Sequence, residues 1–213
     1  MTPAEQSQNA LALCQMAPVI PVLVIEDLAH AVPLAQALVA GGLPVLEVTL
    51  RTDCALEAIQ EMARIEGAVV GAGTVLTPEQ MADAHAAGAR FAVAPGATPS
   101  LIDAARLNEM PLLPGAQTCS EVMSLMELGY TVQKFFPAEA IGGAIALKSI
   151  AGPLPQVTFC PTGGISAARA PDYLALPNVA CVGGSWVAPK DAMTAGDWDR
   201  ITTLARAASQ LPR

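Results

Sequence analysis

The feature that most constrains the fold is an alternation of short apolar runs with alanine-rich helical stretches, repeated along the whole chain. The apolar runs are rich in valine, isoleucine and phenylalanine. Strands and helices that alternate in this way favour βαβ units and a parallel sheet. Several runs are apolar along nearly their full length, as strands covered on both faces require. The expected strands are residues 19–25, 45–50, 69–74, 91–95, 111–114, 131–136, 156–160 and 179–182.

Between the expected strands, apolar residues recur at helical spacing. The expected helices are residues 29–40, 54–65, 78–86, 100–107, 120–128 and 144–150. A further helix is expected before the first strand, over residues 3–15, and another near the end of the chain, over residues 197–210.

This arrangement predicts an α/β fold of the (β/α)8 TIM-barrel type with an additional N-terminal helix. About eight βα units in about 200 residues place the chain at the small end for that fold. A doubly wound open sheet is the alternative. No linker or shift in composition divides the chain, so residues 1–213 are expected to form a single catalytic barrel domain.

Composition limits the classes of function. The chain has 11 Lys and Arg against 19 Asp and Glu, a formal net charge of −8. A net-acidic surface does not attract phosphate backbones or anionic lipid, so neither nucleic acid nor a membrane is expected as a partner. The apolar runs are broken before the ~18 residues that a spanning helix needs. No lysine or arginine precedes Arg51, so the basic segment of a signal peptide is missing and a cytoplasmic protein is expected.

The cysteines and histidines give no sign of a metal site. The cysteines are odd in number and widely spaced, without a Cys-x-x-Cys pair, and are interpreted as small buried apolar residues. His30 and His85 fall in expected helices without a partner at ligand spacing. No dinucleotide-binding or P-loop motif is present. Chemistry without a metal or a cofactor is therefore expected. The five cysteines are Cys14, Cys54, Cys119, Cys160 and Cys181.

Lys134 is the most informative residue, because the chain has only three lysines and this one lies inside an apolar strand. Strand geometry places Val132, Lys134 and Phe136 on one face, expected to be the barrel interior. Burial disfavours the charged ammonium and leaves a free amine that can attack a carbonyl and form a Schiff base. The alternative is a lysine that extends to the strand end or pairs with an acid in the core.

Charged residues also interrupt the second expected strand. Glu47 lies in its middle and shares a face with Thr49 and Arg51. A carboxylate inside the barrel, within reach of an amine from another strand, can act as the general acid and base of imine chemistry. Arg51 would lie at the mouth, where it can bind a substrate carboxylate. The alternative is a buried Glu–Arg pair that only holds the strand end.

Glycine-rich segments end three of the expected strands. Gly163 and Gly164 follow the seventh strand and Gly183 and Gly184 the eighth, the two positions where (β/α)8 enzymes commonly bind phosphate through backbone amides. Tight turns also need glycine, which is the alternative. Thr74 ends a third such segment. Its hydroxyl can donate a hydrogen bond to a substrate carboxylate; the alternative is that the segment is an ordinary turn before a helix.

Five segments carry a family resemblance. They are VLEVTLRT at residues 45–52, GAGTVL at 71–76, KFFPAE at 134–139, FCPTGGI at 159–165 and GGSW at 183–186. With these segments the chain resembles, over nearly its whole length, the bacterial 2-keto-3-deoxy-6-phosphogluconate (KDPG) aldolases. That family also includes the 4-hydroxy-2-oxoglutarate (KHG) aldolases.

The resemblance implies a class I aldolase that uses no metal or cofactor, built on a (β/α)8 barrel and assembled as a homotrimer. Its substrates would be small molecules: KDPG is split into pyruvate and glyceraldehyde 3-phosphate in the Entner-Doudoroff pathway, and KHG into pyruvate and glyoxylate. Lys134 matches the Schiff-base lysine and Glu47 the general acid and base.

The resemblance also assigns the substrate contacts. Arg51 and Thr74 match groups that hold the pyruvyl carboxylate, and Pro95 and Phe136 match the wall of the pocket. Thr162 matches a hydroxyl beside the phosphate end. The expected phosphate site consists of Gly163, Gly164, Gly184 and Ser185.

One departure bears on substrate range. Some relatives have an arginine just before the first strand, where this chain has Gln15, Met16 and Ala17, so a phosphate would rest more on backbone amides. The balance between KDPG and KHG, the stereochemistry at C4 and any side decarboxylation of oxaloacetate stay open. Two other functions also stay open: a phosphosugar isomerase or epimerase with Lys134 as a fixed cation and Glu47 as base, and a non-catalytic phosphate-sensing barrel.

Overall fold

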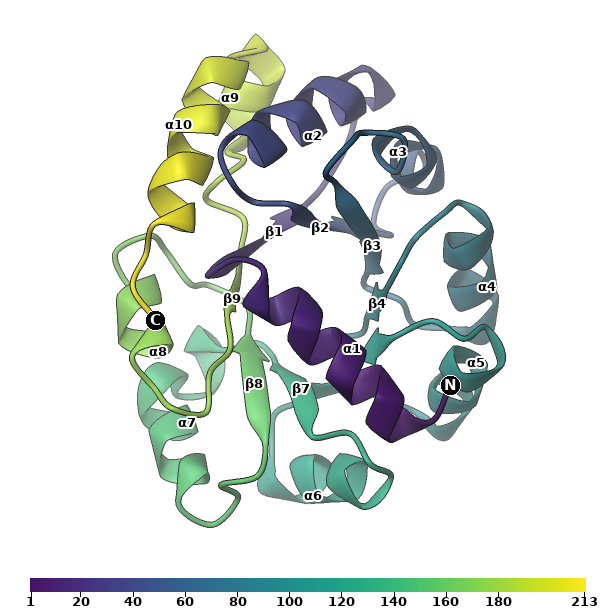
Figure 1. Ribbon diagram of the computed structural model, residues 1–213, viewed down its shortest axis with the longest axis vertical. Coiled ribbons are helices and arrows are strands. Elements are labelled where there is room, and N and C mark those ends of the chain that lie inside the picture. Colours follow the sequence, from purple (N-terminus) through teal and green to yellow (C-terminus); the bar gives the residue numbers. More distant parts are fainter.

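A closed ring of parallel strands surrounded by helices forms the centre of the computed structural model, which describes residues 1–213 (Figure 1). One sheet has the order β5-β4-β3-β2-β1-β9 and the other β6-β7-β8. A parallel bridge between Thr162 and Gly183 joins the β8 and β9 sides. The expected (β/α)8 barrel is therefore confirmed and the open sheet is wrong. The strands are β1 (Val19–Leu23), β2 (Val45–Thr49), β3 (Val69–Gly73), β4 (Ala92–Val93), β5 (Leu112–Leu113), β6 (Gly115–Ala116), β7 (Val132–Phe135), β8 (Thr158–Pro161) and β9 (Val182–Gly184).

The fifth strand of the barrel is split by a proline. Pro114 separates β5 from β6. It has no amide hydrogen, so it cannot donate a hydrogen bond to a neighbouring strand, and the hydrogen-bond ladder is interrupted there. Its carbonyl still accepts a hydrogen bond from the Lys134 amide at 2.8 Å, and Gly115 is in register with Lys134. The strand expected over residues 111–114 is therefore confirmed only as β5, and β6, after the proline, lies beyond the expected range. The last strand also lies later than expected, because Val179 forms only an isolated bridge with Phe159.

Threonine caps define where four of the eight expected helices begin. Thr2, Thr77, Thr98 and Thr118 each accept a hydrogen bond from a backbone amide of the first turn. A proline follows directly in the first three, a position that suits proline because the amide there needs no partner. No helix is long and apolar enough to cross a membrane. The helices are α1 (Pro3–Gln15), α2 (Ala31–Ala40), α3 (Ala55–Met62), α4 (Pro78–Ala86), α5 (Pro99–Leu107), α6 (Cys119–Glu127), α7 (Gly143–Ala151), α8 (Ala170–Leu174), α9 (Lys190–Ala195) and α10 (Trp198–Ser209).

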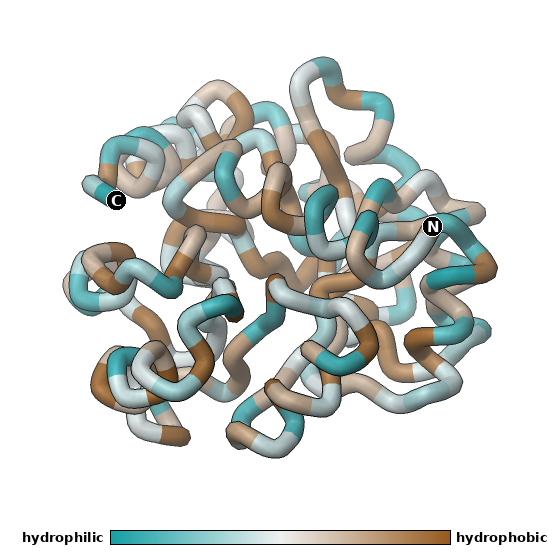
Figure 2. Tube along the Cα trace, turned by 60° about the horizontal axis from the view of Figure 1, so that its bottom comes forward, coloured by the Kyte–Doolittle hydropathy of each residue, from teal (hydrophilic) through white to brown (hydrophobic).

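The N-terminal helix α1 closes one end of the barrel (Figure 1). Ala10 and Cys14 of α1 pack on side chains that point inward from the strands, among them Val45, Phe91 and Val132. Hydrophobic segments run through the centre of the chain trace (Figure 2). Because these strand residues lie at or near the amino ends of their strands, α1 blocks that end, and a ligand must enter at the carboxyl ends, where barrel enzymes bind substrate.

Candidate active site

The interior of the barrel contains one buried ion pair, between Lys134 on β7 and Glu47 on β2. Lys134 Nζ donates a hydrogen bond to Glu47 Oε1 at 3.2 Å. Only 5% of Lys134 and 3% of Glu47 is exposed. The two strands are not neighbours in the sheet, so the pair spans the barrel interior. Lys134 therefore pairs with an acid in the core, as one of the alternatives predicted, and that acid is Glu47.

Burial controls the electrostatics of Glu47. Removal from water raises the pKa of this carboxyl, and the nearby positive charge of Lys134 only partly opposes that shift. A carboxyl whose pKa is raised by burial can hold a proton and release it again during a reaction. The Glu47–Arg51 pair, which was the alternative to a catalytic role, is absent, because Glu47 bonds to Lys134 and Arg51 is exposed.

An aromatic ring completes the surroundings of the amine. Lys134 Nζ lies 5.3 Å from the centre of the Phe136 ring. Phe136 is half-buried, as is Pro95 just after β4. The amine therefore has one charged partner and an apolar side, the combination in which a lysine can act as a nucleophile.

The absence of a side chain at Gly73 makes room for the Glu47 carboxylate. A Cβ atom on Gly73, at the end of β3, would overlap Oε1 of Glu47. Gly71, two residues earlier on the same strand, leaves the same kind of space for the Phe91 ring. Gly73 of the GAGTVL segment thus sets where the Glu47 carboxylate can lie, a role in addition to turn formation.

Replacing Gly73 with alanine is expected to displace Glu47 and lower kcat for any reaction that uses the pair. A misplacement of about 1 Å costs roughly 10²-fold in rate, so a fall of about 10- to 100-fold is expected. Gly152→Ala is the matched control, because a Cβ there makes only an ordinary contact with the Ser149 carbonyl oxygen. Kinetics and thermal unfolding of both variants check this; an unchanged kcat in Gly73→Ala would contradict it.

Three further predicted residues lie at the carboxyl ends of neighbouring strands. Arg51 follows β2, is exposed and forms no ion pair, yet its charge is near enough to lower the pKa of Glu47. Thr74 follows β3 with a φ of 58°, in the left-handed region that strains a β-branched residue. Pro95 follows β4. All three lie at the end of the barrel opposite α1, on the side where Glu47 is located.

The remaining predicted residues form a second group, after β8 and β9. The backbone amides of Gly163, Gly164 and Ser185 donate no hydrogen bond. Thr162 is buried, and its Oγ1 has no hydrogen-bond partner. At Gly184 a Cβ atom would overlap the Trp186 ring, so glycine at this position also permits close packing. Unpaired amides and a buried unpaired hydroxyl suit an anionic or polar ligand.

The loop after β8, which carries Gly163 and Gly164, is held by the segment after β7. The Ala138 amide donates to the Thr162 carbonyl oxygen at 2.8 Å, and the Glu139 amide donates to that of Gly163 at 3.0 Å. Since β7 also carries Lys134, these bonds hold the Gly163 and Gly164 amides in place relative to the amine.

Sequence reasoning missed a pocket beside Ser185. This pocket, of about 540 Å³, is lined by residues after β1 and β9, including Glu26, His30 and Lys190. Lys190 Nζ contacts Glu26 at 2.8 Å. The pair was predictable in principle, because Glu26 and Lys190 follow strands that are neighbours once the barrel closes.

Comparison with known proteins gives one consistent family. The model for KDPG and KHG aldolase matches residues 11–204. A KHG/KDPG aldolase from Escherichia coli (strain K12) is 57% identical over 201 residues, 94% of each chain. A solved structure of the 2-keto-3-deoxy-6-phosphogluconate aldolase of Zymomonas mobilis ZM4 with 3-phosphoglycerate has a TM-score of 0.92 and 53% identity, covering 97% of this chain and 98% of that one. The KDPG aldolase from Legionella pneumophila, with pyruvate captured as a covalent carbinolamine, has a TM-score of 0.91 and 51% identity over 94% and 98%.

Proposed function

The chain belongs to the KDPG and KHG aldolase family, and from this premise we propose that Lys134 and Glu47 carry out its aldol cleavage through a Schiff base. The substrates are KDPG, which gives pyruvate and glyceraldehyde 3-phosphate, and KHG, which gives pyruvate and glyoxylate. The observation that carries this assignment is the buried Lys134–Glu47 hydrogen bond of 3.2 Å. The carbinolamine in the Legionella pneumophila relative supports the same chemistry.

Formation of the imine begins within the pair. Transfer of a proton from Lys134 Nζ to Glu47 Oε1 leaves a neutral amine, which attacks the C2 carbonyl carbon. The raised pKa of Glu47 favours the protonated carboxyl that this step requires. Glu47 then gives this proton to the C2 oxygen, takes a second proton from the nitrogen and delivers it to the resulting C2 hydroxyl. That hydroxyl leaves as water, and the carbinolamine becomes an iminium. The iminium accepts electrons in the next step.

Cleavage uses Glu47 as a base. The carboxylate removes the proton of the C4 hydroxyl, directly or through a water molecule, and the C3–C4 bond breaks. Its electron pair moves to C3 and the iminium, giving an enamine, while C4 leaves as the aldehyde. Protonation at C3 followed by hydrolysis releases pyruvate and restores Lys134.

The carboxyl ends of β2, β3 and β4 hold the pyruvyl part of the substrate in this proposal. Arg51 supplies a guanidinium without a protein partner, and Thr74 a hydroxyl, for the carboxylate. Pro95 and Phe136 form the apolar wall that limits water at the imine. The strained backbone of Thr74 is consistent with a position that function requires.

The group after β8 and β9 holds the distal part. Gly163, Gly164 and Ser185 offer free amides to a phosphate, and Gly184, without a Cβ, lets the backbone just before Ser185 pack on the Trp186 ring. Thr162 places a hydroxyl between this group and the imine. A cradle made of amides binds a dianion although the chain is net acidic.

Replacing Thr162 with valine is expected to lower kcat/KM for KDPG roughly tenfold, the effect of losing one hydrogen bond to a substrate. Stability should not fall, because the hydroxyl has no partner in the folded protein. Thr158→Val, at the other end of the same strand, is the matched control. Kinetics with KDPG and KHG check this; an equal, small effect of both substitutions would contradict the placement of Thr162.

The proposed activity is tested by mixing the protein with KDPG in the presence of a chelator. Equal amounts of pyruvate and glyceraldehyde 3-phosphate are expected, at a rate that the chelator leaves unchanged. Conversion to an isomer without carbon-carbon cleavage would instead support the isomerase alternative, and binding without turnover the phosphate-sensing one.

We further propose a homotrimer that works in the cytoplasm. Large apolar side chains that a monomer would leave in water support an assembly, among them Leu107 at 84% and Ile145 at 80% exposure. Light scattering should give three times the mass of one chain, and a monomer mass would contradict the assembly. Cell fractionation tests the location, and a periplasmic or secreted protein would contradict it.

A further inference from the structure

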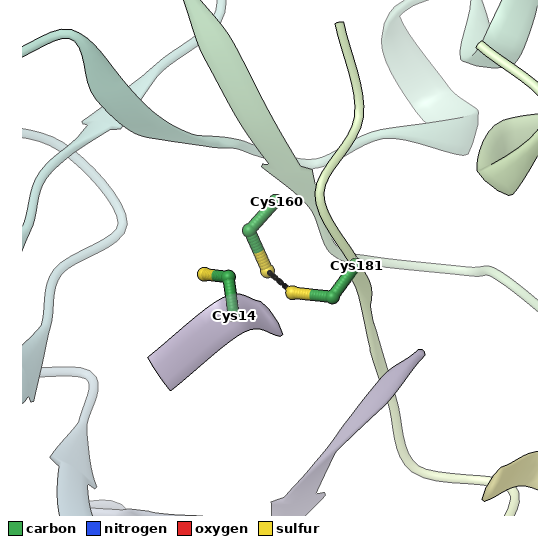
Figure 3. Close-up of side chains that lie close together, drawn as sticks. All are labelled: Cys14, Cys160 and Cys181. Carbon is green, nitrogen blue, oxygen red and sulfur yellow. Dashed lines mark hydrogen bonds between the residues drawn. The ribbon is translucent and has the colours of Figure 1, made fainter. Parts of the chain in front are cut away.

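Three of the five cysteines meet at the end of the barrel that α1 covers. Cys14 comes from α1, Cys160 from β8 and Cys181 from the residue before β9 (Figure 3). Their sulfur atoms all lie within 4.8 Å of one another. Cys181 Sγ donates a weak hydrogen bond to Cys160 Sγ at 3.4 Å. The expectation that all the cysteines are buried is right for these three, whereas Cys119 is exposed and Cys54 half-buried.

The sulfur atoms are enclosed and already close to the spacing of a metal-thiolate site. The three residues are 1%, 2% and 0% exposed, in chain order. An ion with bonds of about 2.3 Å to each sulfur holds the sulfurs roughly 3.8 to 4.0 Å apart. Shifts of less than about 1 Å from the present spacing would therefore reach that geometry. Packing alone needs only small apolar residues here, and does not require that three sulfurs from distant parts of the chain converge.

We propose that Cys14, Cys160 and Cys181 form a three-thiolate binding site for a soft divalent ion of the zinc class. Thiolate sulfur selects Zn²⁺ and Cd²⁺ over Mg²⁺ and Ca²⁺, which prefer oxygen. Binding replaces three thiol protons by one ion, releases those protons and changes no oxidation state. The site lies beside the proposed catalytic pair, but none of its three cysteines takes part in the proposed aldol reaction.

Two features of the surroundings fit an ion at this place. Cys160 is the direct register partner of Lys134 on the neighbouring strand, so a cationic side chain lies beside a complex whose net charge is −1. The ion would also link α1 to the barrel wall, because Cys14 is the only one of the three on α1. At present α1 is held there by contacts such as the 2.8 Å hydrogen bond from Tyr130 to Gln6. Metal binding should therefore stabilise the docked α1.

The test uses the full chain with its other two thiols removed, as the variant Cys54→Ala/Cys119→Ala. Titration of the reduced variant with Cd²⁺ should show one ion per chain, with ultraviolet thiolate-to-cadmium charge transfer and displacement by Zn²⁺. A higher thermal midpoint is expected with the ion. Adding Cys14→Ala to this background should weaken Cd²⁺ binding by about 100-fold or more. Circular dichroism and KDPG cleavage verify that this triple variant is folded.

Slow entry must be separated from absence of a site, because α1 covers the sulfurs. The Cys54→Ala/Cys119→Ala variant is therefore also refolded from denaturant with Cd²⁺ present, and one bound ion is expected. Failure to bind Cd²⁺ both in the native and in the refolded protein would overturn the inference, as would full binding after Cys14→Ala. Because occupancy is read by absorption, a chain that cleaves KDPG but binds no Cd²⁺ overturns this inference alone.

Discussion

Replacing Lys134 with alanine is expected to lower KDPG cleavage by at least about 10⁴-fold, in the range seen when a covalent catalyst is removed. No other amine can take its place, since the remaining lysines, Lys148 and Lys190, are outside the barrel interior. Lys148→Ala is the matched control, with the same substitution at an exposed position of α7, and should keep full activity. Steady-state kinetics with KDPG measure both variants.

The loss of Lys134 also leaves Glu47 buried without its partner, which by itself can destabilise the protein. Lys134→Met, which keeps most of the side-chain volume, separates lost chemistry from lost folding. Glu47 loses its partner in this variant too, so the thermal midpoint should fall, but a Lys134→Met chain that circular dichroism shows to be folded should still fail to cleave KDPG. Near-normal cleavage by a folded Lys134→Met variant would contradict the assignment of the nucleophile.

Replacing Glu47 with glutamine is expected to reduce kcat by about 10² to 10⁴, the usual contribution of a positioned acid and base. Glutamine keeps the shape and can still face Lys134, but it can neither accept the C4 hydroxyl proton nor deliver a proton to the carbinolamine. Glu57→Gln on the exposed face of α3 is the matched control and should leave kcat unchanged.

The same variant gives a pH test with a defined sign. Burial raises the pKa of Glu47, and cleavage requires its ionised form. Activity should therefore fall as the pH is lowered through a value above the ordinary glutamate pKa of about 4.3. In Glu47→Gln this acid limb should disappear from the profile of the residual activity. A limb that persists unchanged would assign it to another group.

The sequence was sufficient to predict most of the fold, because strands buried on both faces are recognisable as apolar runs. The helix α4 agrees with its expected range because Thr77 and the proline after it fix its start. The short helices α8 and α9, of five and six residues, were missed because a segment of that length is too short to show the helical repeat of apolar residues. The split of the fifth strand at Pro114 was also missed, although a proline inside an apolar run indicates a break in strand hydrogen bonding.

Much of the site was predictable for a different reason. Lys134 and Glu47 are charged residues in apolar strands. Because such residues are rare, each of them indicates a functional position without information about its neighbours in space. Their 3.2 Å contact was not predictable, because it depends on how two non-adjacent strands face each other across the closed barrel. The role of Gly73 likewise depends on the position of the Glu47 side chain.

The cysteine cluster shows the same limit. Cys14, Cys160 and Cys181 have no motif spacing, since 146 residues separate the first two and 21 the last two. Only the docking of α1 on the closed barrel brings them together. A search for local metal motifs therefore could not find them.

Reduction with borohydride in the presence of pyruvate, followed by mass spectrometry of the intact chain and its peptides, tests the central claim most directly. The proposed mechanism predicts one reduced pyruvyl adduct per chain, on the peptide that contains Lys134, and none in Lys134→Met. An unmodified wild-type chain that still cleaves KDPG, or an adduct on Lys148 or Lys190, would contradict it.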